Sequence, residues 1–212
     1  PFEFLAPPTT ANGAVATNFG TIKLSGNASV TLQPGVYNSI SASANVTVTM
    51  QPGIYVIKGG GIDLSGNATI NGSGVMIYNT GSDYNVNTGL PDSGDGSAVP
   101  PAGGGATFGA LSISGNGSLR LTAFNNASSP FDGMLFYQRR LNTQTIDLSG
   151  NGALDSMLGT VYAKYAELNL SGNGTMNTQF AVDRLNFTGN GNLVLDNTGH
   201  HYADSDRVFL VE

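Results

Sequence analysis

Short stretches in which hydrophobic and polar residues alternate recur along this chain, and each ends in a small polar corner. In the first, Ile22 and Leu24 face one way and Lys23 the other, before Ser25-Gly26-Asn27. A period of two is typical of a half-buried β-strand, and Gly in the corner can take a positive φ and reverse the chain. Six further copies follow, and the outward slot is polar in all seven: Lys23, Ser41, Asp63, Ser112, Asp147, Asn169 and Asn186.

Two more strands follow the corner in each repeat. A second alternating stretch leads to Gln33-Pro34-Gly35-Val36-Tyr37, which is matched eighteen residues later by Gln51-Pro52-Gly53-Ile54-Tyr55. Pro-Gly marks a turn, so each repeat contains three strands and three bends. This is the pattern of a parallel β-helix coil. We therefore predict an all-β fold, a single-stranded right-handed parallel β-helix (solenoid) of about seven coils. Right-handed winding is expected because the crossover connections between parallel strands are right-handed.

The spacing of the corners defines the expected domain organisation. We expect one domain over residues 1–212, with an N-terminal cap at 1–21 over the first coil, coils at 22–195 and a C-terminal cap at 196–212. The largest gap between corners contains residues 79–108, which are rich in Gly, Pro, Ser and Asp. Such a stretch is expected to be a surface loop inserted into one coil.

Composition excludes several function classes. Only 10% of residues are charged, the net charge is -6, and there is no basic run, which argues against nucleic acid as a partner. No apolar stretch is long enough to span a bilayer, so we expect no membrane contact by this fragment itself. The chain has no Cys, which excludes disulfides and thiolate metal sites.

The corner Asn residues are the first candidate site, and we expect them to stack as an inward-facing ladder that passes hydrogen bonds between coils. The competing hypothesis is glycosylation, because most of these residues begin an Asn-X-Ser/Thr acceptor pattern that the repeat itself generates. The expected ladder is Asn27, Asn45, Asn67, Asn116, Asn151, Asn173 and Asn190.

A second candidate site lies in the insertion, where alternating acidic and amide residues resemble the start of a calcium-binding loop. The match is imperfect, because Gly stands one place late and the final Glu is missing. A solvated loop is the alternative to a calcium site. The candidate ligands are Asp83, Asn85, Asn87, Asp92 and Asp95, and no other cofactor is expected.

β-Helices host enzymes that cleave polysaccharides with paired carboxylates, so the outward Asp residues are candidates for catalysis. Asp63 and Asp147 share the outward slot, but Ser112 separates them, so they belong to coils that are not adjacent. No cluster of Asp, Lys and Arg falls on neighbouring coils. We therefore expect no enzyme activity.

Several motifs together resemble a known family. They are Pro34-Gly35-Val36-Tyr37, the stretch from Pro52 to Gly61, the corner from Gly66, Gly133-Met134-Leu135-Phe136-Tyr137-Gln138-Arg139 and Leu158-Gly159-Thr160-Val161-Tyr162-Ala163. This region is similar to the C-terminal β-helix of bacterial pilus-assembly proteins of the TadG-like and PilX-like kind. A looser likeness to bactofilins, which form polymers, implies possible self-association.

The resemblance implies a non-enzymatic structural protein of a pilus or cell-surface scaffold, extracellular or periplasmic, whose partners are proteins of that assembly. In that family an N-terminal segment absent from this chain directs export. Two alternatives stay open: a carbohydrate-binding or carbohydrate-cleaving β-helix, and a self-polymerising filament subunit.

Overall fold

The protein is all-β over the residues that its computed structural model describes, which are residue 2 and residues 5–92, 106–149, 156–172, 175–188 and 192–193. No helix in these ranges is long and apolar enough to cross a membrane. The elements are a short 3-10 helix η2 (Thr10–Asn12) and the strands β1 (Asn18–Leu24), β2 (Ser29–Leu32), β3 (Gly35–Ala42), β4 (Thr47–Met50), β5 (Gly53–Lys58), β6 (Ile62–Leu64), β7 (Thr69–Thr80), β8 (Leu111–Ile113), β9 (Ser118–Ala123), β10 (Met134–Gln138), β11 (Ile146–Ser149), β12 (Ser156–Ser171), β13 (Thr175–Thr188) and β14 (Asn192–Leu193).

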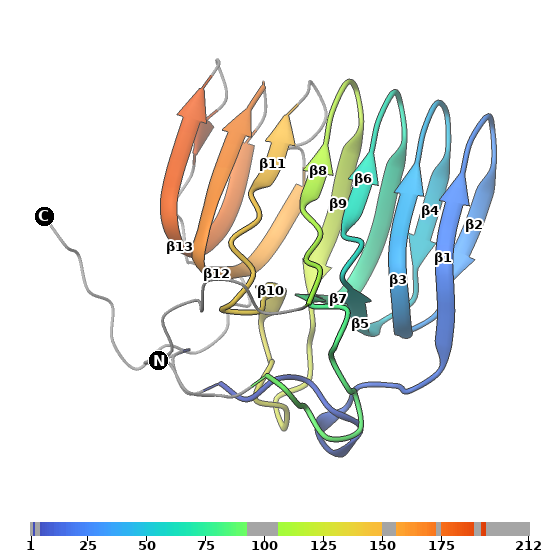
Figure 1. Ribbon diagram of the computed structural model, residues 1–212. Coiled ribbons are helices and arrows are strands. Elements are labelled where there is room, and N and C mark those ends of the chain that lie inside the picture. Colours follow the sequence, from blue (N-terminus) through green and yellow to red (C-terminus); the bar gives the residue numbers. More distant parts are fainter. Residues whose placement is uncertain are drawn as a thin grey trace, which may run out of the picture.

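All the strand pairs are parallel, and strands pair mainly with counterparts about one repeat away in the sequence. For example, β1 pairs with β3, β2 with β4, and β12 with β13. The ribbon winds from β1 and β2 at one end to β13 at the other, as in a β-solenoid (Figure 1). We call each passage of the chain around the molecule a coil.

The first face of the solenoid contains β1, β6, β8, β11 and the C-terminal parts of β3, β12 and β13. Its register confirms the repeat read from the sequence, because each outward residue pairs with the outward residue of the next coil. The column runs Lys23, Ser41, Asp63, Ser112, Asp147, Asn169 and Asn186.

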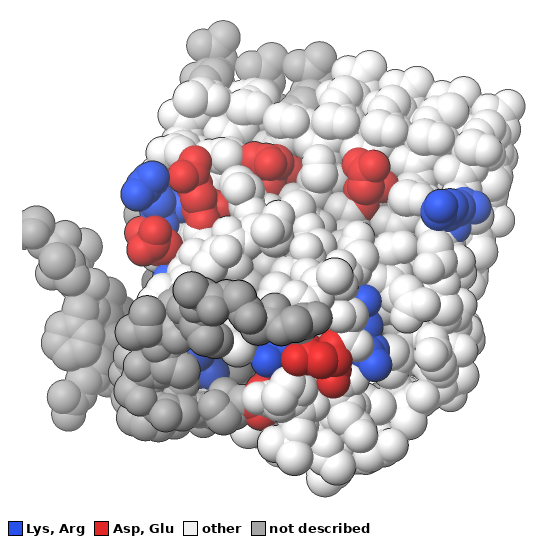
Figure 2. All heavy atoms as spheres, viewed as in Figure 1, with Lys and Arg blue, Asp and Glu red and all other residues white. Residues whose placement is uncertain are grey.

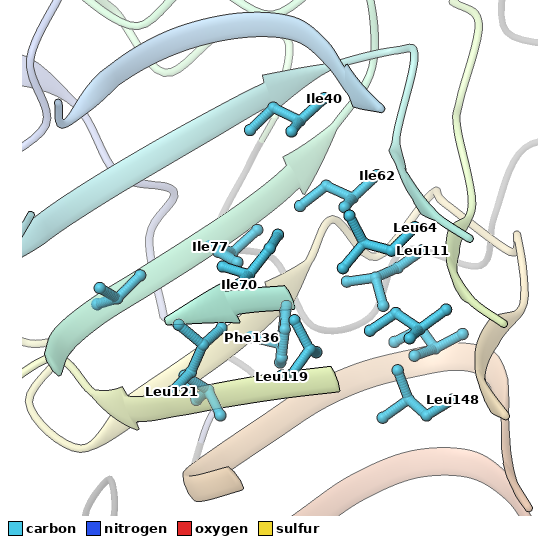
Figure 3. Close-up of a cluster of buried hydrophobic side chains, with 14 of the residues drawn as sticks. Ile40, Ile62, Leu64, Ile70, Ile77, Leu111, Leu119, Leu121, Phe136 and Leu148 are labelled. Carbon is cyan, nitrogen blue, oxygen red and sulfur yellow. The ribbon is translucent and has the colours of Figure 1, made fainter. Parts of the chain in front are cut away.

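The interior is filled by the aliphatic residues that alternate with these polar positions. Ile40, Leu64 and Ile70 are at most 1% exposed, and they pack with residues from all three strands of each coil (Figure 3). Burying a side chain of this size contributes about 1.5–3 kcal/mol, so the lumen is the main source of stability. The hydrophobic positions of the alternating repeat therefore face the interior.

The second face contains β2, β4, β9 and the N-terminal parts of β7 and β12. The third face, which contains β5, β10 and parts of β3, β7, β12 and β13, is largely buried on both sides. Its outward column includes Val56, Tyr78, Tyr137 and Tyr162 on successive coils, and these residues belong to a second apolar cluster outside the lumen. A sheet covered on both faces needs continuous rather than alternating apolar runs, which explains Ile54-Tyr55-Val56-Ile57.

The N-terminal segment covers this third face, so the expectation that residues 1–21 cap the first coil is wrong. Phe2 lies edge-on to Tyr162, with ring centroids 5.5 Å apart, and Tyr137 Oη donates to the carbonyl of Leu5 at 2.8 Å. The segment then runs along the side of the solenoid before the chain enters β1 (Figure 1). The physical reason is the Tyr-rich outer face, because Phe2 and Leu5 pack in the apolar cluster that this face forms.

The insertion begins later than the surface loop expected over residues 79–108. Asn79 and Thr80 are buried inside β7, so the excursion begins after Thr80. Its first part packs on the third face, where Tyr84 is 1% exposed and stands edge-on to Tyr78. Residues 93–105, and the expected C-terminal cap at 196–212, lie outside the described residues.

Candidate functional site

The outward column of the first face forms a chain of side-chain hydrogen bonds near β13. Asn169 Nδ2 donates to Asp147 Oδ1 at 2.7 Å, and Asn186 Nδ2 donates to Asn169 Oδ1 at 2.9 Å. Asn186 also donates to Glu167, which pairs with Arg184 at 3.3 Å. In each of these bonds the donor belongs to the later coil and the acceptor to the earlier coil.

A shallow groove of about 650 Å³ lies along these residues. Hydroxyl, amide and carboxylate groups line it beside Leu185 and Phe187 of β13. Figure 2 shows acidic side chains spaced along one line across the surface, with basic side chains at both ends of that line. The groove is therefore a polar surface that can donate and accept hydrogen bonds. The polar lining residues are Ser112, Asp147, Ser149, Asn169, Ser171, Asn186 and Thr188.

The corner Asn side chains that the structure describes are joined in a file. Asn45 donates to Asn27 at 3.0 Å, Asn67 to Asn45 at 2.9 Å, and Asn116 to Asn67 at 3.2 Å, each from Nδ2 to Oδ1. All four side chains are exposed, so the expected inward-facing orientation is wrong. Ser-Gly-Asn bends outward because the corner lies between two strands whose aliphatic residues fill the lumen. Asn151, Asn173 and Asn190 lie outside the described residues.

Among the candidate calcium residues that the structure describes, the two carboxylates are paired with an arginine. Asp83 Oδ1 accepts from Arg139 Nη1 at 2.8 Å, and Asp92 is ion-paired with Nε of the same side chain. Asn85 Oδ1 accepts from the backbone N–H of Asn87 at 2.9 Å, an Asx turn on the surface. Asp95 is outside the described residues, within which no three His, Asp or Glu side chains are grouped as metal ligands are. The guanidinium therefore supplies the positive charge here.

Asp92 is the most buried carboxylate of this group, with 7% of the residue exposed. Its Oδ2 accepts hydrogen bonds from Tyr78 Oη and from Thr80 Oγ1, the latter at 2.7 Å. Burial raises the pKa of Asp92, although the Tyr78 hydrogen bond and the charge of Arg139 act in the opposite direction. Burial and the nearby charge of Asp92 raise the pKa of Tyr78. The arrangement anchors the excursion after β7 to the end of β10.

A neighbouring arginine, Arg140, ties the N-terminal segment to the same face. Its guanidinium donates to Tyr162 Oη at 3.0 Å, to Tyr137 Oη at 3.2 Å and to the carbonyl of Phe2. The residue is 5% exposed, so these bonds are made away from bulk water, where losing one partner is costly. Arg139 and Arg140 therefore lock two distant segments onto the third face.

Sequence reasoning missed these two arginines. Two signals point to them: the unbroken apolar runs of the third strands, and the Arg139-Arg140 pair one residue after the run Met134-Leu135-Phe136-Tyr137. An apolar run implies a covered outer face, and arginine is the residue suited to binding carboxylates and carbonyl groups at a buried edge.

Comparisons with known proteins give no match: no protein-family model fits the chain, and neither curated proteins nor solved structures match it.

Proposed function

We propose that this chain is a non-enzymatic structural protein, a rigid β-solenoid that serves as a scaffold in a pilus or another cell-surface assembly. The proposal rests on one observation: the stabilising contacts hold the solenoid in one shape. Ladder pairing, the Asn file and the buried Arg139 and Arg140 contacts all fix the shape of the solenoid. The first face keeps a regular column of polar side chains, which supports its use as a surface for protein partners.

We further propose that the solenoid is right-handed and has seven coils. Parallel crossovers are right-handed in nearly all known cases, which supports the handedness. The seven copies of the outward slot support the number of coils. A high-resolution experimental structure tests both points, and a left-handed winding or a different number of coils contradicts them.

The proposed location, at the cell surface or in the periplasm, is supported by the resemblance to pilus-assembly β-helices. The test is to raise antibodies to the chain and to follow it in cells of the organism that encodes it. We expect it in the envelope or in sheared surface filaments. Protease added to intact cells should degrade it if it is at the surface and leave it intact if it is periplasmic. Recovery only with cytoplasmic proteins would contradict the proposal.

The groove beside Asp147 favours a second candidate function, binding of an extended polysaccharide. Its hydroxyl, amide and carboxylate groups repeat at the strand spacing of about 4.8 Å and offer both donors and acceptors to sugar hydroxyls. The test is a glycan array, with the Asp147→Ala variant as a control. Signals that the variant loses support this candidate, and equal signals from both chains oppose it.

A further inference from the structure

We propose that Asn126 carries a glycan, linked through the nitrogen of its side chain. This assignment rests on the proposed location outside the cytoplasm, because linkage of a sugar to an Asn-X-Ser/Thr pattern is typical of secreted proteins. It goes beyond the scaffold role, because it gives a covalent modification to a loop that this role does not use. The pattern begins at Asn27, Asn45, Asn67, Asn71, Asn116, Asn126, Asn169, Asn173 and Asn186, of which Asn173 lies outside the described residues.

At the corners, the fold buries part of the acceptor pattern. The middle residue is buried or packs against the lumen, since Val46 and Ala68 are 0% exposed, Gly117 is buried and Ala28 contacts the same cluster. The third residue is the first residue of β2, β4, β7 or β9. Asn71 lies inside β7 and is paired on both sides. A transferase must bind the backbone around the Asn that it modifies, so the folded chain does not offer it these positions.

At most of these positions the nitrogen that would be linked is already a hydrogen-bond donor. Nδ2 donates within the corner file at Asn45, Asn67 and Asn116. It donates within the outward column at Asn169 and Asn186. A bulky glycan at any of them would break a bond between adjacent coils. These patterns are therefore by-products of the repeat.

The pattern Asn126-Ala127-Ser128 differs, because it lies in the connection between β9 and β10, outside the strands. Of the patterns within the described residues, it is the one in which all three residues are exposed. The base of the connection is held in place, since Gly133 N donates to Phe124 O at 2.8 Å and Phe131 is 0% exposed. The tripeptide therefore stands at the tip of an ordered loop that projects beyond the strands (Figure 1).

The reacting nitrogen is available at this position. Oδ1 of Asn126 accepts a hydrogen bond from the backbone N of Ser128 at 3.1 Å, whereas Nδ2 has no hydrogen-bond partner among the described residues. The backbone N of Asn126 donates to Asp132 Oδ1 at 2.6 Å. The backbone of the acceptor residue is thus fixed by its neighbours while its nitrogen stays open to a transferase.

In the transfer step, Nδ2 of Asn126 attacks the anomeric carbon of a sugar that is activated as a diphosphate ester. The bond between that carbon and the diphosphate oxygen breaks, and its electron pair leaves with the diphosphate. One proton passes from Nδ2 to a base of the transferase. The glycan then extends from the bend between the second and third faces, so the polar column of the first face stays open to partners.

The first experiment examines the native protein, captured with antibodies from the organism that encodes it. Its protease peptides are measured by mass spectrometry before and after treatment with an enzyme that removes Asn-linked glycans and leaves Asp in place of the Asn. We expect a glycan on the peptide with Asn126 and none on the peptides with Asn45, Asn67 or Asn169. An unmodified Asn126 overturns the inference in whichever cell fraction the chain is found. The fraction itself tests the proposed location, so the two failures are distinguishable.

The second experiment supplies the folded chain with a purified transferase for Asn-X-Ser/Thr and glucose activated by uridine diphosphate. A synthetic peptide of residues 124–130 verifies that the transferase is active. We expect a single added glucose on the wild type, on Ser128→Thr, which keeps the hydroxyl, and on Asn125→Gln, the matched change beside the pattern. Asn126→Gln and Ser128→Ala should gain none, with circular dichroism as the check that they are folded. A folded wild type that gains no glucose overturns the inference, as does glucose on Asn67 to the same extent as on Asn126.

Discussion

Ala44 has a backbone conformation that is costly for any residue except glycine. Its φ is +64°, whereas the same position in the neighbouring corners is occupied by Gly26 at +75° and Gly66 at +70°. The corner is held from both sides, because Asn45 N donates to Gly26 O at 2.9 Å and Asn67 N donates to Ala44 O at 2.8 Å. Ala44 therefore cannot relax, and Ala44→Gly should stabilise the protein.

The magnitude follows from two opposing effects. Left-handed backbone costs an L-residue about 1–2 kcal/mol, which glycine avoids. Glycine loses about 0.4–1 kcal/mol through the greater freedom of the unfolded chain. Ala44 is exposed, so little packing is lost with its methyl group. The net expected gain is about 0.8 kcal/mol, which is a rise in melting temperature of about 2–3 °C for a chain of this size.

Urea denaturation followed by circular dichroism measures the change, with the slope m unchanged between variants. Gly26→Ala should lose about the same amount that Ala44→Gly gains, because a Cβ there has no atom within 4 Å and only the backbone is strained. Gly66→Ala should lose more, since its Cβ would lie 2.9 Å from the Ala44 nitrogen. Ala127→Gly, in an exposed loop, is the control and should lose about 0.4–1 kcal/mol. If Ala44→Gly loses as much as Ala127→Gly, the reasoning about the stacked corners is refuted.

Three other predictions concern the ladder, the buried carboxylate and calcium. Asn67→Ala should lower the free energy of unfolding by about 1 kcal/mol in urea denaturation, because Asn67 donates to Asn45 and accepts from Asn116 in an exposed file. Asn27→Ala, at the end of the file, should lower it less. Equal losses for the two variants would count against the file. Burial raises the pKa of Asp92 in the folded chain, so the folded chain binds this proton more tightly than the unfolded chain does. The contribution of this proton to the free energy of unfolding is therefore complete below about pH 4 and is lost as the pH rises through the pKa of Asp92 in the folded chain. The stability of Asp92→Asn should therefore improve relative to wild type between about pH 4 and pH 7, and a difference that stays flat over this range contradicts the assignment. Calcium, or its removal by a chelator, should leave the melting temperature unchanged because Arg139 already pairs with Asp83 and Asp92; a calcium-dependent rise would restore the calcium hypothesis.

The repeat was predictable because each position in it has one dominant physical requirement. Leu24 and its counterparts must face the lumen, Lys23 and its counterparts must face water, and Gly26 must reverse the chain. These local requirements are enough to place the first face in register across the described coils. The orientation of the Asn file was not predictable in this way, since an amide can satisfy its hydrogen bonds on either side of a corner.

The contacts on the third face depend on residues that are far apart in the sequence. Arg140 meets Phe2 across 138 positions, and Arg139 meets Asp83 across 56. No local pattern encodes such a pairing, because neither segment of a pair carries a signal that identifies its partner. The unbroken apolar runs show that something covers the face, but not which segment does so. The N-terminal cap was mispredicted for this reason, and the contacts that hold the first part of the surface insertion were not predicted.

The central claim is that the outward residues form one column at the spacing of parallel strands. The chain has no Cys, so pairs of introduced cysteines can carry spin labels without background, and pulsed electron resonance gives the distance between them. One label replaces Lys23, and the other replaces Asp147, Asn169 or Asn186. These positions lie four, five and six strands away from Lys23 along the column. We predict distances of about 19, 24 and 29 Å, which increase by one strand spacing at each step. Distances that do not increase in equal steps would show that these residues do not share one wound ribbon.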